Sequence, residues 1–178
     1  GTIAQRKTQD TSTRSSTNAW LPRELSVTTE AIYERAASVM RLDPTLLAKR
    51  HDENPRQHSI AEALQVVHYN AGGEEYQPHH DFVVPPVAHR YQPTRFATLL
   101  LYLNTVEGEG AETIFPRAMT KDKAEGISVR PKQGRAVLFY NMLPDGNVDE
   151  LSQHGSSPTN EREEKWLANL WVWDPIID

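Results

Sequence analysis

The sequence contains no cysteine among its 178 residues. That absence excludes disulfide bridges, zinc sites built on thiolates and a cysteine nucleophile. It leaves the cellular compartment open.

Long apolar runs and an excess of positive charge are also lacking. No stretch approaches the roughly 18 apolar residues that a membrane-spanning helix needs, and the first 20 residues lack the apolar centre of a secretory signal. The formal net charge is −5, from 19 basic and 24 acidic residues, whereas phosphate binding needs clustered lysine and arginine. We therefore expect no nucleic-acid partner and no membrane contact by this domain.

The length and the moderate hydrophobic content predict one domain over residues 1–178. Serine, threonine and asparagine dominate the first 24 residues, which we interpret as a strand and an irregular segment. A helix follows, capped by Thr28 or Thr29, because apolar residues recur at helical spacing up to Met40. A short helical piece over 44–49 and a polar loop over 50–59 complete this half.

From residue 63 onward, short segments rich in β-forming residues alternate with turn signals. Eight strands in two sheets would make a jelly roll. We thus predict a mainly β fold with flanking helices, a double-stranded β-helix (jelly roll). The expected strands are 63–69, 80–84, 96–103, 112–115, 127–130, 136–140, 150–154 and 165–173.

The pattern His-x-Asp/Glu occurs twice, and its context separates the two copies. His51 lies in a polar run that ends in Asn54-Pro55, which is typical of a loop. His79 and Asp81 fall in a segment that suits a strand, where residues two apart project to the same face and can reach one ion. Ligation by the adjacent His80 and Asp81 would need a bulge. We favour His79 with Asp81.

A distant histidine, His154, could complete a metal site with His79 and Asp81. Two imidazoles and one carboxylate on one side of a metal form the facial triad of non-haem Fe(II) oxygenases. Lys165 follows His154 by eleven residues and could hold the carboxylate of a co-substrate. A zinc hydrolase also fits the three ligands, although it gives Lys165 no role.

The last expected strand alternates two kinds of residue. Trp166 and its neighbours of the same parity are apolar and read as core, whereas Lys165 shares a face with Trp171 and Trp173. A lysine in an apolar cleft is unfavourable unless it meets a negative charge. The alternative is that Lys165 extends to solvent, which is the commoner fate of an isolated lysine.

Four stretches resemble the prolyl 4-hydroxylase branch of the Fe(II)/2-oxoglutarate dioxygenases, most closely its transmembrane-type and its algal or invertebrate members. They are LQVVHYNAGGEEYQPHHDF, RFATLLLYLNTVEGEGAETIFP, VRPKQGRAVLFYNMLPDGNVDELSQHG and KWLANLWVWDP. They occur in the family's order and cover nearly all of residues 63–175. The segment TSTRSSTNAWL also resembles the amino-terminal segment beside the peptide groove of such enzymes, and what precedes it looks trimmed.

The resemblance implies a role for each matching residue. His79, Asp81 and His154 would be the ligands of Fe(II), and Lys165 would pair with the distal carboxylate of 2-oxoglutarate. Tyr69 and Thr113 match hydroxyl residues around that carboxylate, and Trp171 matches an aromatic beside the co-substrate. The two matches to substrate-contacting positions are Arg95 in the peptide groove and Trp173, which replaces a residue that is often polar in relatives.

The implied activity is 4-hydroxylation of proline in a peptide or protein substrate, coupled to decarboxylation of 2-oxoglutarate to succinate and CO2. Oxygen is the second co-substrate and ascorbate the expected reductant, and the endoplasmic reticulum is the compartment that the resemblance suggests. Read without the family, Tyr69 and Trp171 could be core aromatics, Thr113 an ordinary strand residue and Arg95 a surface charge. An oxygenase acting on another residue or small molecule, and a non-catalytic jelly-roll binding module, remain alternatives.

Overall fold

The computed structural model describes residues 13–48, 60–82, 94–121 and 125–174. Within these ranges the chain forms nine strands, one α-helix, α1 (Val27–Met40), and the short 3-10 helices η1 (Arg23–Leu25), η2 (Pro44–Leu47) and η3 (Glu150–Ser152). The strands are β1 (Thr17–Leu21), β2 (Leu64–Tyr69), β3 (Tyr76–His79), β4 (Arg95–Tyr102), β5 (Thr113–Met119), β6 (Glu125–Val129), β7 (Ala136–Tyr140), β8 (His154–Ser156) and β9 (Lys165–Trp173).

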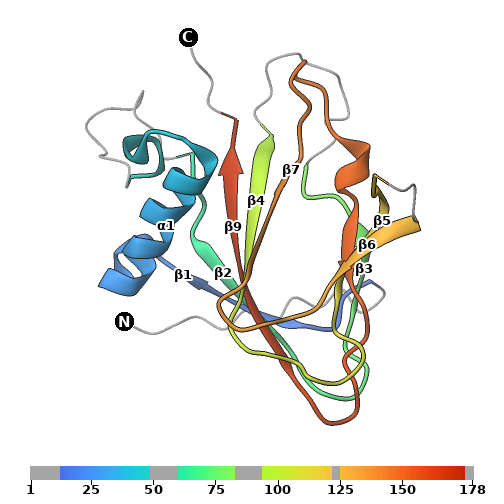
Figure 1. Cartoon of the computed structure of the whole chain (residues 1–178). Helices are drawn as coiled ribbons and strands as arrows, with labels where there is room; N and C mark the ends of the chain where they lie inside the picture. Colours follow the sequence, from blue (N-terminus) through green and yellow to red (C-terminus); the bar gives the residue numbers. More distant parts are fainter. Residues whose placement is uncertain (1–12, 49–59, 83–93, 122–124, 175–178) are drawn as a thin grey trace.

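The strands form two antiparallel sheets. The larger sheet has the order β1-β2-β9-β4-β7, and the smaller has the order β3-β8-β5-β6. Figure 1 shows the two sheets facing each other, with α1 on the outer side of the larger one. The predicted jelly roll, with helices flanking a mainly β structure, is confirmed.

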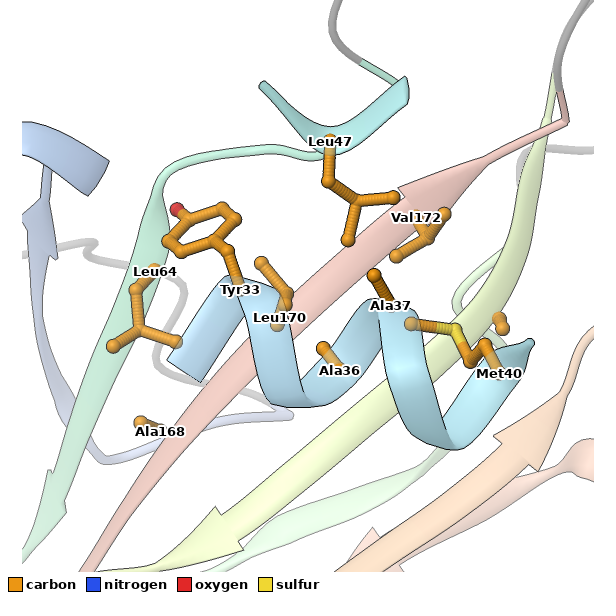
Figure 2. Close-up of a cluster of buried hydrophobic side chains, with 10 residues drawn as sticks. Tyr33, Ala36, Ala37, Met40, Leu47, Leu64, Ala168, Leu170 and Val172 are labelled. Carbon is orange, nitrogen blue, oxygen red and sulfur yellow. The ribbon is translucent and has the colours of Figure 1, made fainter. Parts of the chain in front are cut away.

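The main apolar core lies between α1 and the outer face of the larger sheet. Figure 2 shows Tyr33 and Met40 of the helix in the same buried cluster as Leu170 of the central strand β9. The helix supplies small residues at its closest approach, Ala36 and Ala37, and both are completely buried. Close packing of this face fixes the position of β9, and so fixes where the opposite face of the strand points.

The register of the larger sheet carries one irregularity that matters for the site. Arg95 of β4 is paired with Trp173, and Ala97 with Val172, so β4 has one extra residue at this point. A bulge of this kind turns the preceding side chain toward the other face of the sheet. Arg95 therefore points inward, although its odd number matches that of Ala97 on the outer face.

Three sequence-based details were wrong. Residues 80–82 are not a strand, because β3 occupies Tyr76–His79 and the chain bends directly after it. The expected strand over 150–154 is instead η3 followed by β8. The cap of α1 is Ser26, whose side chain accepts from the backbone N–H of Thr29 while Thr29 bonds back to the backbone N–H of Ser26.

Two predicted features lie outside the described residues, namely the polar loop over 50–59 and the alternative motif at His51 within it. Across the part of the chain that the structure describes, no helix has the length and apolar character needed to cross a membrane.

Candidate metal centre and its cavity

Three potential metal ligands from separate parts of the chain meet at one point. His79 ends β3, Asp81 lies in the bend that follows, and His154 begins β8. The two strands are antiparallel neighbours in which His79 is paired with His154, so the sheet sets the two imidazoles together. One potential ligand atom from each of the three residues lies within 4.8 Å of the others. The convergence expected from the sequence is therefore present.

Hydrogen bonds turn the same ring nitrogen of both histidines toward this point. Nδ1 of His79 lies 2.9 Å from Gln77 O, and Nδ1 of His154 lies 3.0 Å from Ser152 O. A carbonyl oxygen only accepts, so each Nδ1 carries a proton, and in the neutral ring each Nε2 then keeps its lone pair. Nε2 of His79 lies 3.7 Å from Asp81 Oδ1, and Nε2 of His154 lies 3.6 Å from Asp81 Oδ2. Ligation by Nε2 with Nδ1–H held by a carbonyl is the usual arrangement at metal sites.

The two oxygens of the Asp81 carboxylate have different surroundings. Oδ2 accepts a hydrogen bond from Thr98 Oγ1 over 2.7 Å and another from Trp171 Nε1 over 2.9 Å. No described residue donates a hydrogen bond to Oδ1. The protein thus holds one oxygen and leaves the other to face a cation.

Burial and neighbouring charge set the protonation states of these groups. Burial lowers the pKa of His79, and the adjacent His154 lowers it further, so the ring is neutral at neutral pH. Burial by itself raises the pKa of Asp81, but His154 and the Thr98 hydroxyl outweigh it and leave this pKa below its ordinary value. Neutral imidazole and ionised carboxylate are the forms that bind metals. Two nitrogens and one carboxylate oxygen suit Fe(II) with positions left open.

A cavity of about 300 Å³ adjoins the three ligands, and its walls come from both sheets. Along β9 the residues that line it are Leu167, Asn169 and Trp171, which alternate along the strand. The apolar residues of the other parity, such as Leu170, pack against α1. The parity of the last strand predicted this division correctly.

Lys165 lies behind the cavity wall and is completely buried. Its Nζ donates a hydrogen bond to Ser156 Oγ over 2.8 Å, and the rings of Tyr69 and Tyr102 lie 5.3 and 5.9 Å away. Among the described residues, no carboxylate forms an ion pair with Nζ. Burial lowers the pKa of Lys165 to about 7, a shift that the charge of Glu112 opposes. The lysine does not extend to solvent, and a small anion in the cavity would stabilise its charged form.

The two hydroxyl residues predicted near Lys165 are also present at the cavity. Tyr69 and Thr113 both line it, and Thr113 is paired with Ser156 across the smaller sheet. Burial raises the pKa of Tyr69 to about 12, so its hydroxyl keeps the proton and can donate. The Tyr102 hydroxyl lies 2.7 Å from Thr113 Oγ1 and 3.2 Å from Val129 O, and these hydrogen bonds hold the Thr113 side chain in place.

Glu62 is the carboxylate of a cluster that also contains Arg95, Trp171 and Trp173. The guanidinium carbon of Arg95 lies 3.8 Å from the centre of the Trp171 ring. Glu62 accepts hydrogen bonds from Arg95 Nε and Nη2 over 2.7 and 3.1 Å, and from Trp173 Nε1 over 2.8 Å. Arg95, Trp171 and Glu62 line the cavity, and Trp173 lies next to them outside its described lining.

Sequence reasoning missed Glu62, Tyr76 and Arg14. The ring of Tyr76 stacks on His79 at 3.7 Å, and the guanidinium of Arg14 lies 4.6 Å from the same tyrosine ring. Strand parity would place Tyr76 and His79 on opposite faces, but an irregular register between them brings both to one side. Glu62 is one of 24 acidic residues, and only its place just ahead of a strand could have singled it out.

Two further histidines, His68 and His80, are not part of the ligand group. His68 stacks on Trp166 with ring centres 3.9 Å apart, and its Nε2 lies 2.8 Å from Glu164 Oε2. His80 lines the cavity, but its Nε2 lies 3.2 Å from the carbonyl oxygen of Glu150 and it is not part of the ligand group.

Known proteins are similar in sequence to this chain over much of its length. A family model described as the 2OG-Fe(II) oxygenase superfamily matches residues 64–173. "Probable prolyl 4-hydroxylase 3" of Arabidopsis thaliana is 34% identical over 178 residues, covering 93% of this chain and 56% of the relative. "Prolyl 4-hydroxylase 5" of the same plant is 38% identical over 122 residues, covering 62% and 41%. This chain spans about half the length of these relatives.

Solved structures of similar fold carry related names. A viral collagen prolyl hydroxylase from Paramecium Bursaria Chlorella virus-1, in its 2OG complex, superposes with a TM-score of 0.68 at 24% identity, covering 90% of this chain and 80% of the viral one. A Pseudomonas putida prolyl-4-hydroxylase reaches a TM-score of 0.60 at 16% identity, covering 94% and 76%. Identities this low establish the shared fold alone.

The family match covers residues 64–173, the region that contains the three potential ligands and Lys165. The chain therefore belongs to the 2OG-Fe(II) oxygenase superfamily and, within it, to the prolyl 4-hydroxylase family.

Proposed function

We propose that this chain hydroxylates C4 of proline in a peptide or protein, coupled to the oxidative decarboxylation of 2-oxoglutarate to succinate and CO2. One observation carries the proposal: the small cavity lined by Asp81 is also lined by Ser156, which accepts a hydrogen bond from the buried ammonium of Lys165. A dicarboxylic acid can meet both a metal and a lysine at once. The names of the relatives, prolyl 4-hydroxylases, support proline as the residue acted on.

In this proposal His79 Nε2, His154 Nε2 and Asp81 Oδ1 hold Fe(II). When bound there, the metal supplies the oxidising chemistry that no amino-acid side chain can provide. The protein holds the three ligands in fixed tautomeric and ionised states before the metal arrives. Both the ring orientations and the carboxylate orientation are set by hydrogen bonds to backbone carbonyls, Thr98 and Trp171.

The distal carboxylate of 2-oxoglutarate would bind to Lys165, with Tyr69 and Thr113 as hydroxyl donors. An ion pair in a buried site needs further hydrogen bonds to offset the loss of hydration, and these two residues offer them. Trp171 would form the adjoining wall. Holding the co-substrate at its far end orients its other end toward the metal and keeps water out of the space between.

The peptide would bind across Arg95, Trp171 and Trp173. Glu62 uses two N–H groups of the Arg95 guanidinium, and the remaining N–H groups can donate to backbone carbonyls of an extended chain. Proline-rich segments are already extended in the polyproline II form and bind well to grooves with aromatic walls. The Trp173 ring, held at its edge by Glu62, presents a face to a proline ring.

Ascorbate is proposed as the reductant that keeps the metal in its reduced state. This part rests on the family alone, and omission of ascorbate from the assay tests it. The endoplasmic reticulum stays a prediction.

The test of the proposed function is succinate formation with Fe(II), 2-oxoglutarate and a panel of proline-rich peptides. Mass spectrometry of the peptides locates the added oxygen, and Asp81→Ala serves as the inactive control. We expect succinate formation that depends on peptide, with hydroxylation on proline. Succinate formed with a different residue or a small molecule would indicate a related oxygenase. A protein that binds no 2-oxoglutarate would be a binding module.

A further inference from the structure

We propose that Thr98 and Asn141 are positioning residues that select Oδ1 of Asp81 as the single metal-binding oxygen. This inference rests on the proposed metal centre. Asp81 needs such support because it lies in a bend beyond the end of β3, where no sheet hydrogen bonding fixes its orientation. Its side chain is oriented by the groups that bond to Oδ2 instead.

The acceptor positions of Asp81 Oδ2 are fully used by hydrogen bonds from the protein. A carboxylate oxygen offers about two acceptor positions, and Thr98 and Trp171 take both. A carboxylate whose two oxygens are equally free can bind a metal through either or both of them. Here only Oδ1 remains, so the carboxylate occupies one coordination position and leaves more positions to other ligands.

Asn141 sets the direction in which the Thr98 hydroxyl points its proton. Asn141 Nδ2 donates a hydrogen bond to Thr98 Oγ1 over 3.0 Å. An ionised carboxylate can only accept, so the hydroxyl proton must point to Asp81. If the amide were turned over, its oxygen would face Thr98 Oγ1, and one proton would have to serve two acceptors. The chain of donors therefore runs in one direction, from Asn141 through Thr98 to Asp81.

The residues of this hydrogen-bonded series are buried and held by the sheet. Asn141 is 0% exposed and Thr98 is 1% exposed. Thr98 lies in the middle of β4, between its partner residues on β7 and β9. Asn141 follows β7 directly, and its backbone N–H and C=O are both bonded, to Phe96 O and Asp149 N, each over 2.8 Å.

The oxygen end of the Asn141 amide has different surroundings from its nitrogen end. Asn141 Oδ1 is buried and has no hydrogen-bond partner among the described residues. A buried acceptor without a partner destabilises a protein, because the hydration that it loses is not replaced. An apolar residue of similar shape would avoid this penalty. The presence of asparagine is explained if the donor end of its side chain orients Thr98 and Asp81.

The experiment compares Mn²⁺ affinity, measured by titration calorimetry without turnover, in the wild type and four variants. Thr98→Val removes the hydroxyl at nearly constant shape, and Thr98→Ser keeps it. Asn141→Leu removes the amide. Thr29→Val is the matched control, because Thr29 is also a buried threonine with hydrogen bonds but lies at the start of α1. The melting temperature of each metal-free variant is recorded alongside.

We expect Thr98→Val to weaken Mn²⁺ binding by about 10- to 100-fold, the usual effect of losing an outer hydrogen bond to a metal ligand. Thr98→Ser should restore it to within about threefold, and Asn141→Leu should weaken binding without lowering the metal-free melting temperature. Thr29→Val should lower the melting temperature and leave Mn²⁺ affinity unchanged.

The inference would be overturned if Thr98→Val bound Mn²⁺ as tightly as the wild type does. It would also be overturned if Thr98→Ser and Thr98→Val lost Mn²⁺ affinity to the same extent. If Thr98→Val does not fold, Asn141→Leu decides, and unchanged affinity in that variant overturns the inference. A wild type that binds no Mn²⁺ contradicts the proposed metal centre instead, so the two failures are distinguishable.

Discussion

Lys165 and Ser156 join the two sheets through a hydrogen bond of 2.8 Å between Nζ and Oγ, at a depth where the lysine is completely buried. Lys165 begins β9 of the larger sheet and Ser156 ends β8 of the smaller one. The contact places an ammonium group between the sheets, next to the cavity that holds the potential metal ligands. The neutral hydroxyl of Ser156 stabilises the charge of the ammonium only in part. An anion bound in the cavity would stabilise that charge further.

We expect the affinity for 2-oxoglutarate to fall as the pH rises above about 7. Burial lowers the pKa of Lys165 from 10.5 to about 7, and a bound carboxylate favours the charged form. Binding must therefore take up a proton wherever the free protein has lost it. Affinity is full below the lowered pKa and falls above it by up to about tenfold per pH unit. Calorimetry with Mn²⁺ between pH 7 and 9, in buffers of different ionisation enthalpy, measures both the Kd and the proton uptake.

Two substitutions of Lys165 serve as controls for this pH dependence. Lys165→Arg keeps a charge at every pH in the range. The affinity of this variant for 2-oxoglutarate should therefore hardly change with pH, whatever its absolute value. Lys165→Met should bind poorly throughout. A wild-type Kd that stays constant between pH 7 and 9 without proton uptake would show that the free lysine does not lose its proton there.

Removing any one of the three proposed metal ligands should abolish turnover. His79→Ala, Asp81→Ala and His154→Ala each leave two ligands, too few to hold the metal in a fixed geometry. Mn²⁺ at a concentration of 100 times its Kd should stabilise the folded wild type by about 2.7 kcal/mol, because it binds only the folded state. The melting temperature of the wild type should therefore rise, and that of the variants should not. His68→Ala is the control, because His68 pairs with Glu164 instead. Retained stabilisation by Mn²⁺ in a variant would exclude its residue from the site.

Glu62→Gln should weaken peptide binding and leave co-substrate binding intact. The change keeps the shape of the side chain but removes the charge that holds Arg95 beside Trp171. A charged hydrogen bond contributes about 1.5–3 kcal/mol, so the KM for peptide should rise about tenfold or more while the KM for 2-oxoglutarate stays constant. Glu30→Gln, which breaks a similar Arg–Glu pair beside α1, is the control. An equal rise in both KM values would assign Glu62 to the general structure of the cavity.

The sequence predicted those features of the site that depend on strand periodicity. Alternation along the last strand correctly assigned Leu170 to the core and Trp171 to the cavity. The same periodicity also pointed to a pair that does lie together, His79 and Asp81, but through an argument that the structure does not support. Asp81 is not in a strand, and its orientation depends on Thr98 and Trp171, which are distant in sequence.

Features that depend on pairing across the fold left no local pattern. Glu62 and Arg95 are 33 positions apart, and their contact also depends on the bulge that turns Arg95 inward. Tyr76 reaches His79 only because the register of β3 with β8 is irregular. Hydrophobic periodicity assumes regular strands, so it fails at bulges, which are common beside active sites.

At Gly155 the strand β8 closely approaches the backbone of β3. A Cβ atom at this position would lie 2.7 Å from Tyr76 O and 3.1 Å from Pro78 N. These are backbone atoms, so they cannot rotate away as a side chain can. Gly155→Ala should therefore push the two strands apart and shift His154 relative to His79, its partner in the register.

We expect Gly155→Ala to lower stability by about 1–3 kcal/mol, as overpacking usually does. Turnover should fall further, by on the order of 100-fold, because small displacements of reacting groups have effects of that size. Gly108→Ala is the matched control: its Cβ would meet Glu163 Oε2 at 2.7 Å, but this atom ends a flexible side chain. Melting temperature, Mn²⁺ affinity and turnover should separate the two variants. If Gly155→Ala loses stability while keeping its Mn²⁺ affinity, the distance between β3 and β8 does not determine the metal geometry.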